Sequence, residues 1–300
     1  MCGIVGLFLK DKALEPHLGG LVAGMLATMC DRGPDSAGFA VYGDSQPDRV
    51  KLTLRGPSAA LLEELTAKLA MTAGTPIAPV TRDTHMTILV PIAREQAVRD
   101  AIAASASDVT VVGAGRRMEI FKEVGRPDTV ASRFDLGRMS GTHAIGHTRM
   151  ATESAVTTNG AHPFTTGTDQ CLVHNGSLSN HNAVRRTLVH EGLTFETDND
   201  SEVAAGYLTW RMREGLSLGD ALQASLADLD GFYTFVVGTE SGFGVLRDPI
   251  ACKPAVMAET DHWVAMASEY RAIAVLPGAE DAATWEPEPG RVYSWERQLV

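Results

Sequence analysis

Residues 1–10 read MCGIVGLFLK, and this stretch decides how the rest of the chain must be arranged. Apolar and β-branched residues run together from Gly3 to Phe8 and then stop at a charged turn, a pattern typical of a short buried strand. We therefore expect the chain to enter a β-sheet almost at its first residue. If Met1 is removed, Cys2 carries a thiol beside a free α-amine, and the two groups titrate within about one unit of each other. A proton can then pass from the thiol to the amine, which makes Cys2 a candidate nucleophile.

The bulk composition indicates an ordinary globular protein. The chain has 300 residues, and 44% of them are hydrophobic, which is enough to build a sizeable core. Acidic residues outnumber basic ones by 37 to 26, and the resulting net charge of −11 repels polyphosphate backbones. The composition therefore argues against nucleic-acid binding and favours small molecules or proteins as partners.

The apolar runs and the cysteines indicate the compartment. The longest apolar stretches, such as Met86 to Ala93, are far shorter than the roughly 20 residues that cross a bilayer. No cationic region precedes the apolar run near the N-terminus, so it makes a poor signal peptide. The cysteines form no CxxC pair, which argues against a zinc ribbon or a dense disulfide framework. We expect a cytoplasmic protein without a membrane segment, in which Cys30, Cys171 and Cys252 are small buried hydrophobic side chains.

Three parts of the chain differ in their pattern of residues. Apolar residues at helical spacing predict a helix between about Glu15 and Cys30, packed on the first strand. Residues from about 50 to 130 alternate helix and strand patterns, and we expect a small α/β insertion there. Gly113 to Gly115 lack the complete GxGxxG spacing and are interpreted as a turn. Within the insertion, helices are predicted at 59–70 and 95–104 and strands at 86–92 and 109–112. After the insertion, helices are predicted at 200–213 and 218–229, between blocks of strands.

Several short motifs follow the opening MCGIVG in order along the chain. They are Arg32–Gly38 (RGPDSAG), Gly146–Arg149 (GHTR), His174–Gly176 (HNG), Asp200–Glu202 (DSE), Arg247–Pro249 (RDP), Lys253–Pro254 (KP) and Ala267–Glu269 (ASE). In this order they resemble the class II glutamine amidotransferases over nearly the whole chain. The resemblance implies an α+β fold, a four-layer αββα sandwich of the N-terminal-nucleophile hydrolases, as one domain over residues 1–300 with the insertion at its edge. It also implies that the Cys2 thiol attacks the side-chain amide of glutamine.

The resemblance assigns residues that recognise the two charged groups of glutamine. Arg149 offers a planar fork to the α-carboxylate, which a lysine would not reproduce. Asp200 accepts hydrogen bonds from the ammonium group, although an aspartate just before a predicted helix could also serve only as an N-cap. Arg32 and Thr152 are counted with these substrate-binding residues.

The resemblance also assigns the groups that stabilise the transition state. The Asn175 side chain and the Gly176 backbone N–H would form the oxyanion hole for the charge that develops on the amide oxygen. An Asn-Gly pair is also typical of a β-turn, and the two interpretations are compatible. His147 and His174 are interpreted as packed or orienting histidines, because the α-amine already supplies the base.

The loop after the first predicted helix contains a further pair of charged residues. The resemblance implies that Arg32 and Asp35 help to order Cys2 and the pocket around it. A simple structural ion pair is as good an interpretation of these residues as a direct catalytic contact.

The sequence also carries expectations about partners. Met150 and Glu153 stand where aminosugar-forming relatives carry Trp and His, so that acceptor is not expected. The chain most resembles the small glutaminase subunit of glutamate-synthase-like complexes, including the N-methylglutamate synthase type. No second domain is expected, so a separate synthase subunit would use the ammonia and hold any FMN and iron–sulfur centres, while this chain would hold no cofactor or metal. Two alternatives stay open: a self-sufficient amidohydrolase acting on another amide, and a catalytically silent scaffold subunit.

Overall fold

The structure is a computed structural model that describes residues 2–105, 107–151 and 156–298. The strand predicted at the N-terminus is β1 (Gly3–Leu9), and it pairs antiparallel with β8 (His143–Arg149) on one side and β13 (Trp263–Ala267) on the other. β1 therefore lies in the middle of a seven-stranded sheet of order β14-β12-β13-β1-β8-β2-β7. The remaining strands of this sheet are β2 (Ser36–Tyr42), β7 (Met118–Val124), β12 (Val256–Glu259) and β14 (Ala283–Trp285).

A second sheet of four strands completes the main body, in the order β15-β11-β10-β9. Its strands are β9 (Cys171–Leu178), β10 (Gly231–Gly238), β11 (Gly242–Arg247) and β15 (Val292–Glu296). A hydrophobic cluster joins the two sheets: Phe8 of β1 stacks on Phe243 of β11 with ring centroids 6.0 Å apart, and Ile4 belongs to the same cluster. Successive strand residues point to opposite faces, so the other residues of β1 face away from the second sheet.

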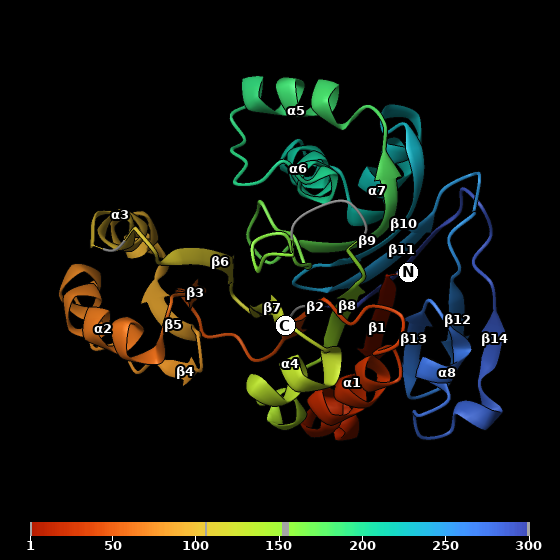
Figure 1. Cartoon of the computed structure of the whole chain (residues 1–300), viewed down its shortest axis with the longest axis horizontal. Coiled ribbons are helices and arrows are strands. Elements are labelled where there is room, and N and C mark those ends of the chain that lie inside the picture. The colour runs from red at the N-terminus through yellow and green to blue at the C-terminus, as the bar shows by residue number, and fades with distance from the viewer. Residues whose placement is uncertain (1, 106, 152–155, 299–300) are drawn as a thin grey trace.

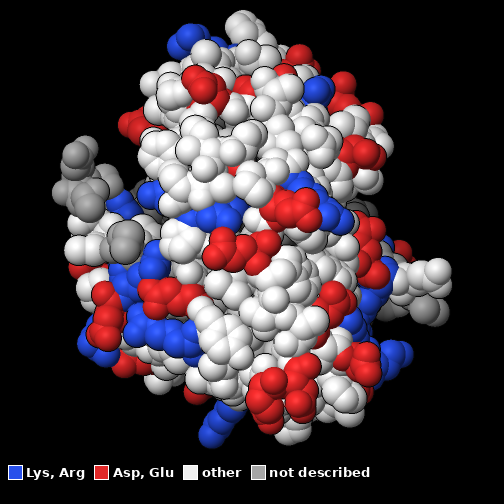
Figure 2. Space-filling model, turned by 90° about the vertical axis from the view of Figure 1, so that its right-hand side faces the viewer, with Lys and Arg blue, Asp and Glu red and all other residues white. Residues whose placement is uncertain are grey.

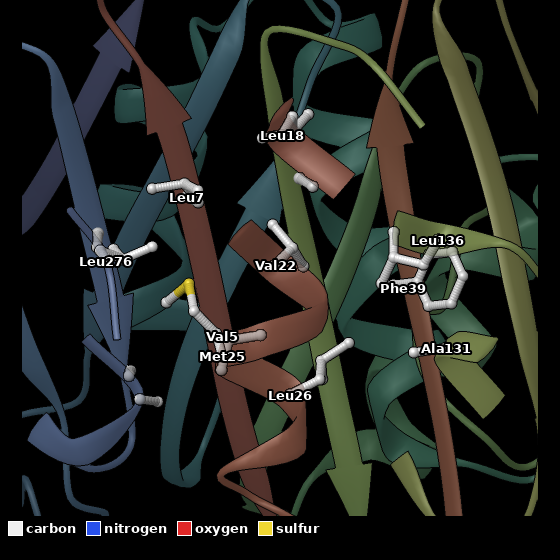
Figure 3. Close-up of a cluster of buried hydrophobic side chains, with 14 of the residues drawn as sticks. Val5, Leu7, Leu18, Val22, Met25, Leu26, Phe39, Ala131, Leu136 and Leu276 are labelled. Carbon is white, nitrogen blue, oxygen red and sulfur yellow. The ribbon is translucent and has the colours of Figure 1, made fainter. Parts of the chain in front are cut away.

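The outer face of the seven-stranded sheet is covered by helices, as Figures 1 and 3 show. Val5, Leu7 and Leu9 pack in a cluster with α1 (Leu18–Ala27), and α4 (Pro127–Arg133) and α8 (Tyr270–Ile273) contribute to the same cluster. The α1 side chains that face the sheet recur at helical spacing, and each fully buried Leu or Val contributes about 1.5–3 kcal/mol. They are Leu18, Val22, Met25 and Leu26.

Three helices cover the outer face of the four-stranded sheet (Figure 1). They are α5 (His181–His190), α6 (Asp200–Arg213) and α7 (Leu218–Asp228). Leu188 of α5 and Leu208 of α6 belong to one buried cluster with Phe235 of β10. The helices predicted at 200–213 and 218–229 therefore form, and both support the sheet that contains the HNG motif.

The predicted insertion is a separate small sheet with its own hydrophobic cluster, drawn at the left of Figure 1. The sheet has the order β4-β5-β3-β6, and the cluster packs it against two helices. The insertion ends nearer residue 115 than residue 130, because β7 pairs with β2 and α4 packs on the main body. Its elements are β3 (Arg49–Arg55), α2 (Ala59–Ala73), β4 (Val80–Arg82), β5 (His85–Pro91), α3 (Glu95–Ser105) and β6 (Thr110–Gly115).

The interpretation of Gly113–Gly115 as a turn is wrong. These residues lie in β6, and the chain turns at Arg116 and Arg117 instead. The backbone N–H groups of Arg116 and Arg117 donate to the carboxylate of Asp169, at 2.6 and 2.9 Å. A Cβ atom at Gly115 would lie 2.2 Å from Asp169 Oδ1, so the glycine is needed for this close approach rather than for a turn.

Candidate active site

Cys2 immediately precedes β1, the strand that pairs with the GHTR motif of β8. Gly3 pairs with Thr148 of β8, so the cysteine lies beside the last residues of that strand. Its carbonyl oxygen accepts hydrogen bonds from Arg32 Nε at 2.7 Å and from Asn175 Nδ2 at 3.2 Å. The thiol is partly exposed, and its sulfur is 3.8 Å from the carbonyl oxygen of Met150. Two side chains from distant parts of the sequence therefore hold the backbone of the candidate nucleophile.

Arg32 is buried and divides its guanidinium between two acceptors. Besides its bond to Cys2, it forms an ion pair with Glu269, which also pairs with Arg271 at 2.6 Å. Burial acts to raise the pKa of Glu269, but the hydrogen bond and charge of Arg32 outweigh it and lower that pKa. The structure thus places Arg32 against the backbone of Cys2, with its charge balanced by a carboxylate.

Asn175 and Gly176 lie within β9 rather than at a turn between strands. They pair with Thr234 and Tyr233 of β10, so the Asn-Gly pair is not a β-turn. Gly176 has a φ of +149°, and a Cβ atom there would lie 2.0 Å from the carbonyl oxygen of Phe232. Only glycine fits this position without strain, and the Asn175 side chain beside it reaches the carbonyl oxygen of Cys2.

Arg149 and Asp35 lie beside each other where β8 ends and β2 begins. Arg149 is largely buried, and its carbonyl oxygen accepts from the Asp35 backbone N–H at 3.1 Å. The Asp35 carboxylate accepts from the Ala151 backbone N–H at 2.8 Å, so Asp35 connects the loop after α1 to the segment that follows β8. Thr152, expected among the substrate-binding residues, and Glu153 lie outside the described residues.

Asp200 begins α6, but the N-cap of this helix is Asn199. The Asn199 side chain accepts from the Ser201 backbone N–H at 2.9 Å, whereas Asp200 Oδ2 accepts from the Leu178 backbone N–H at 2.9 Å. Asp200 therefore faces the end of β9, just beyond Gly176. Its side chain is 23% exposed and keeps room for a further donor.

Three histidines form a buried layer behind Asn175. His147 stacks on His162 with ring centroids 4.0 Å apart, and the Ser201 hydroxyl lies 2.9 Å from His162 Nε2 and from His174 Nδ1. Burial lowers the pKa of His147 to about 3 and that of His174 to about 4, and it lowers the pKa of His162 well below its ordinary value. The rings are therefore neutral at physiological pH, and the burial of His147 and His174 agrees with their interpretation as packed or orienting histidines.

The sequence motifs did not assign roles to His162 or Ser268. His162 belongs to no motif, and only its place in the fold brings it to Ser201. Ser268 belongs to the ASE motif, and its hydroxyl oxygen accepts from the Ile4 backbone N–H at 2.9 Å and from Asn175 Nδ2 at 3.2 Å. The ASE motif includes Ser268, but the motif does not reveal its contact with Asn175. That contact forms only when the strands of the two sheets come together in the fold.

The surface charge, the possible metal ligands and the helices bear on whether the chain could bind a charged partner, a metal ion or a membrane. Figure 2 shows basic and acidic side chains interspersed on one face of the molecule, without a patch of one sign. Within the part of the chain that the structure describes, no three His, Cys, Asp or Glu side chains are grouped so that they could hold a metal ion. No helix among the described residues is both long enough and apolar enough to span a bilayer.

Known proteins resemble this chain in sequence, two of them over nearly its whole length. The glutamine amidotransferase domain family matches residues 147–275. The glutamine amidotransferase-like protein GlxB of Rhizobium meliloti is 59% identical, over 99% of this chain and 99% of its own. A protein of Methanothermobacter thermautotrophicus named as a putative glutamine amidotransferase is 34% identical, over 98% of this chain and 99% of its own. The glutamine–fructose-6-phosphate aminotransferase of Vibrio vulnificus is 34% identical over 129 residues, which are 43% of this chain and 21% of that protein.

Solved structures share the fold. Glutamine phosphoribosylpyrophosphate amidotransferase from B. subtilis has a TM-score of 0.62 at 21% identity, and the match covers 98% of this chain and 47% of that one. An allosteric regulatory enzyme of purine biosynthesis has a TM-score of 0.64 with the same identity and coverage. The mixed α/β fold is thus one that amidotransferases have, and the two full-length relatives establish the family. The chain belongs to the glutamine amidotransferase family.

Proposed function

We propose that this chain is a class II glutamine amidotransferase in which Cys2, freed of Met1, hydrolyses glutamine to glutamate and ammonia. The observation that carries the proposal is that Asn175 Nδ2 lies 3.2 Å from the carbonyl oxygen of Cys2 itself. The candidate oxyanion donor therefore meets the candidate nucleophile, although 173 positions separate them in the sequence. Arg149 lies at the end of β8, the strand that pairs with β1 beside Cys2, and Asp200 lies at the start of α6, where its carboxylate accepts from the Leu178 N–H at the end of β9.

The arrangement supports a two-step reaction. The α-amine of Cys2 takes the thiol proton, the thiolate attacks the amide carbon, and the oxyanion accepts hydrogen bonds from Asn175 Nδ2 and the Gly176 N–H. The protonated amine then gives its proton to the leaving nitrogen, which departs as ammonia and leaves a thioester. Water, activated by the same amine, hydrolyses the thioester to glutamate and restores the thiol.

Substrate recognition follows from charge. Arg149 would pair with the α-carboxylate and Asp200 with the ammonium group, so free glutamine satisfies both. An amide without these two charges would form neither of these charge-assisted contacts, so it would bind more weakly than glutamine.

We further propose that the ammonia passes to a separate synthase subunit of the glutamate-synthase or N-methylglutamate-synthase type, which would carry FMN and iron–sulfur centres. Support comes from the Vibrio relative, in which the matching segment is about a fifth of a longer chain named as an aminotransferase. In that protein the matching segment is thus part of a longer chain with further regions.

Glutamate and ammonia released from glutamine test the proposal, with the Cys2→Ala variant as the matched control. We expect turnover by the native protein, none by the variant, and faster turnover when a co-purifying flavoprotein is added. Equal rates on glutamine and on an amide lacking both charged groups would support the self-sufficient amidohydrolase instead. No turnover by the native protein, either alone or with the flavoprotein added, would support the catalytically silent scaffold.

A further inference from the structure

We infer that His147 is a positioning residue that fixes the orientation of the Asn175 side-chain amide toward Cys2. The inference rests on the proposed function, because it concerns the oxyanion donor of that reaction. His147 lies on β8 in the seven-stranded sheet, whereas Asn175 lies on β9 in the four-stranded sheet. The imidazole therefore spans the space between the two sheets.

The contacts of the His147 ring determine where its proton lies. Nε2 is 3.1 Å from the carbonyl oxygen of His174 and 3.1 Å from Asn175 Oδ1. A carbonyl oxygen only accepts hydrogen bonds, so Nε2 must carry the proton. Burial keeps the ring neutral, and Nδ1 is then the unprotonated nitrogen; it has no hydrogen-bond partner among the described residues.

A protonated Nε2 can face only the oxygen of the Asn175 amide. The opposite side of this amide faces the carbonyl oxygen of Cys2, which again only accepts, so the Asn175 nitrogen must point there. The N–H of His147 on one side and the carbonyl oxygen of Cys2 on the other therefore require the same orientation of the Asn175 amide. If the amide were flipped, its oxygen would face the oxygen of Cys2 and its N–H would face the N–H of His147.

The ring itself is held in place from behind. His147 stacks on His162, and His162 Nε2 is 2.9 Å from the hydroxyl of Ser201, which follows Asp200 in the first turn of α6. A side chain that only filled space would need neither the proton nor this anchoring. Asn175 also donates to Ser268, and an oxyanion can take over one of its two N–H groups only if the amide already points that way.

Two substitutions separate the hydrogen bond from packing. His147→Leu keeps the bulk and removes the donor, and His147→Gln keeps an N–H donor. We expect the Leu variant to lose at least about tenfold in kcat, less than the roughly 100- to 1,000-fold typical of losing the donor outright, with little change in KM for glutamine. The Gln variant should recover most of the loss.

The chain offers a matched control on the same strand. His143 is as buried as His147, but its Nε2 donates to the carbonyl oxygen of Thr239, and it forms no hydrogen bond with Asn175 among the described residues. His143→Leu should lower stability and leave kcat unchanged. In an Asn175→Ala background, His147→Leu should cost nothing further, because the group it positions is gone.

Additive losses in the double variant, or full kcat in His147→Leu, would overturn the inference and leave His147 a packing residue. If the native protein does not turn over glutamine, the proposed function fails, and ¹⁵N NMR of the His147 ring still decides the inference. We expect the tautomer with the proton on Nε2 at neutral pH. A proton on Nδ1 would contradict the assignment whatever the activity.

Discussion

At the scale of single residues, replacement of Asn175 is expected to separate chemistry from binding. Asn175→Ala removes one oxyanion donor, so kcat should fall by roughly 100- to 1,000-fold while KM for glutamine changes little. Steady-state kinetics measure both quantities. Asn180→Ala is the control, because Asn180 bonds to the Asp228 carbonyl oxygen and the Asp230 N–H instead of Cys2. An equal loss in the control would point to a general effect on folding.

Replacement of Arg149 is expected to do the reverse. Arg149→Lys keeps the charge but loses the planar fork, which weakens the pairing with the α-carboxylate by on the order of 1.5–3 kcal/mol and raises KM by about 10- to 100-fold. The measurement is the dependence of rate on glutamine concentration. An unchanged KM would remove Arg149 from the carboxylate site.

The motifs predicted individual residues better than they predicted contacts. Cys2 and Asn175 were identified from their motifs, and the structure brings them together. His162 could not be identified, because its partner Ser201 is brought beside it only when α6 packs behind β9. Asp200 was left between two roles, since the sequence does not show that Asn199 caps the helix.

At the scale of elements, Asp169 holds the turn between β6 and β7, where the insertion rejoins the main body. Its buried carboxylate accepts from the backbone N–H groups of Arg116, Arg117 and Met118. Asp169→Ala leaves these donors without a charged acceptor, and we expect a loss of about 2–4 kcal/mol in the free energy of unfolding. Chemical denaturation measures it, with the exposed Asp108→Ala as control. A loss as small as in the control would show that water replaces the carboxylate.

Local pattern was sufficient for the regular elements and insufficient for their connections. The helices expected at 59–70 and 95–104 are present as α2 and α3, because apolar residues at helical spacing bury one face. Gly113–Gly115 were assigned to a turn because glycines are common in turns. The true reason for Gly115 is the carboxylate of Asp169, 54 positions farther along the chain, which no local pattern reveals.

At the scale of the whole molecule, buried neutral histidines should make stability depend on pH. Burial lowers the pKa of His85, His143 and His147 to about 3, whereas an unfolded histidine titrates near pH 6.5. Between these values the unfolded chain binds protons that the folded chain does not. The stability present above about pH 6.5 is therefore lost as the pH falls toward 3, by about 1.4 kcal/mol per pH unit for each such histidine.

Chemical denaturation at pH 7.5, 6.5 and 5.5 measures this dependence. His85 packs against Phe121 and Phe134, and His85→Leu should lower the slope of stability against pH by about 1.4 kcal/mol per pH unit, because the unfolded chain then binds one proton fewer. Stability that stays constant between pH 6.5 and 5.5 would show that the histidines protonate in the folded protein.

The order of the sheets could not be predicted from the sequence. The first strand was expected to be buried, and it is, but its place between β8 and β13 depends on segments more than 130 residues away. The range 50–130 was chosen for the insertion because its residues alternate helix and strand patterns. Strand β7 has the same local pattern, and only its pairing with β2 assigns it to the main body.

The central claim is that mature Cys2 is the nucleophile, and the mass of the intact protein tests it most directly. The protein is measured before and after reaction with an electrophilic glutamine analogue, and the modified residue is located by peptide mapping. We predict a mature chain that lacks Met1 and gains one adduct on Cys2, and no adduct in Cys2→Ala. An active protein that retains Met1, or an adduct on Cys30, Cys171 or Cys252, would contradict the account.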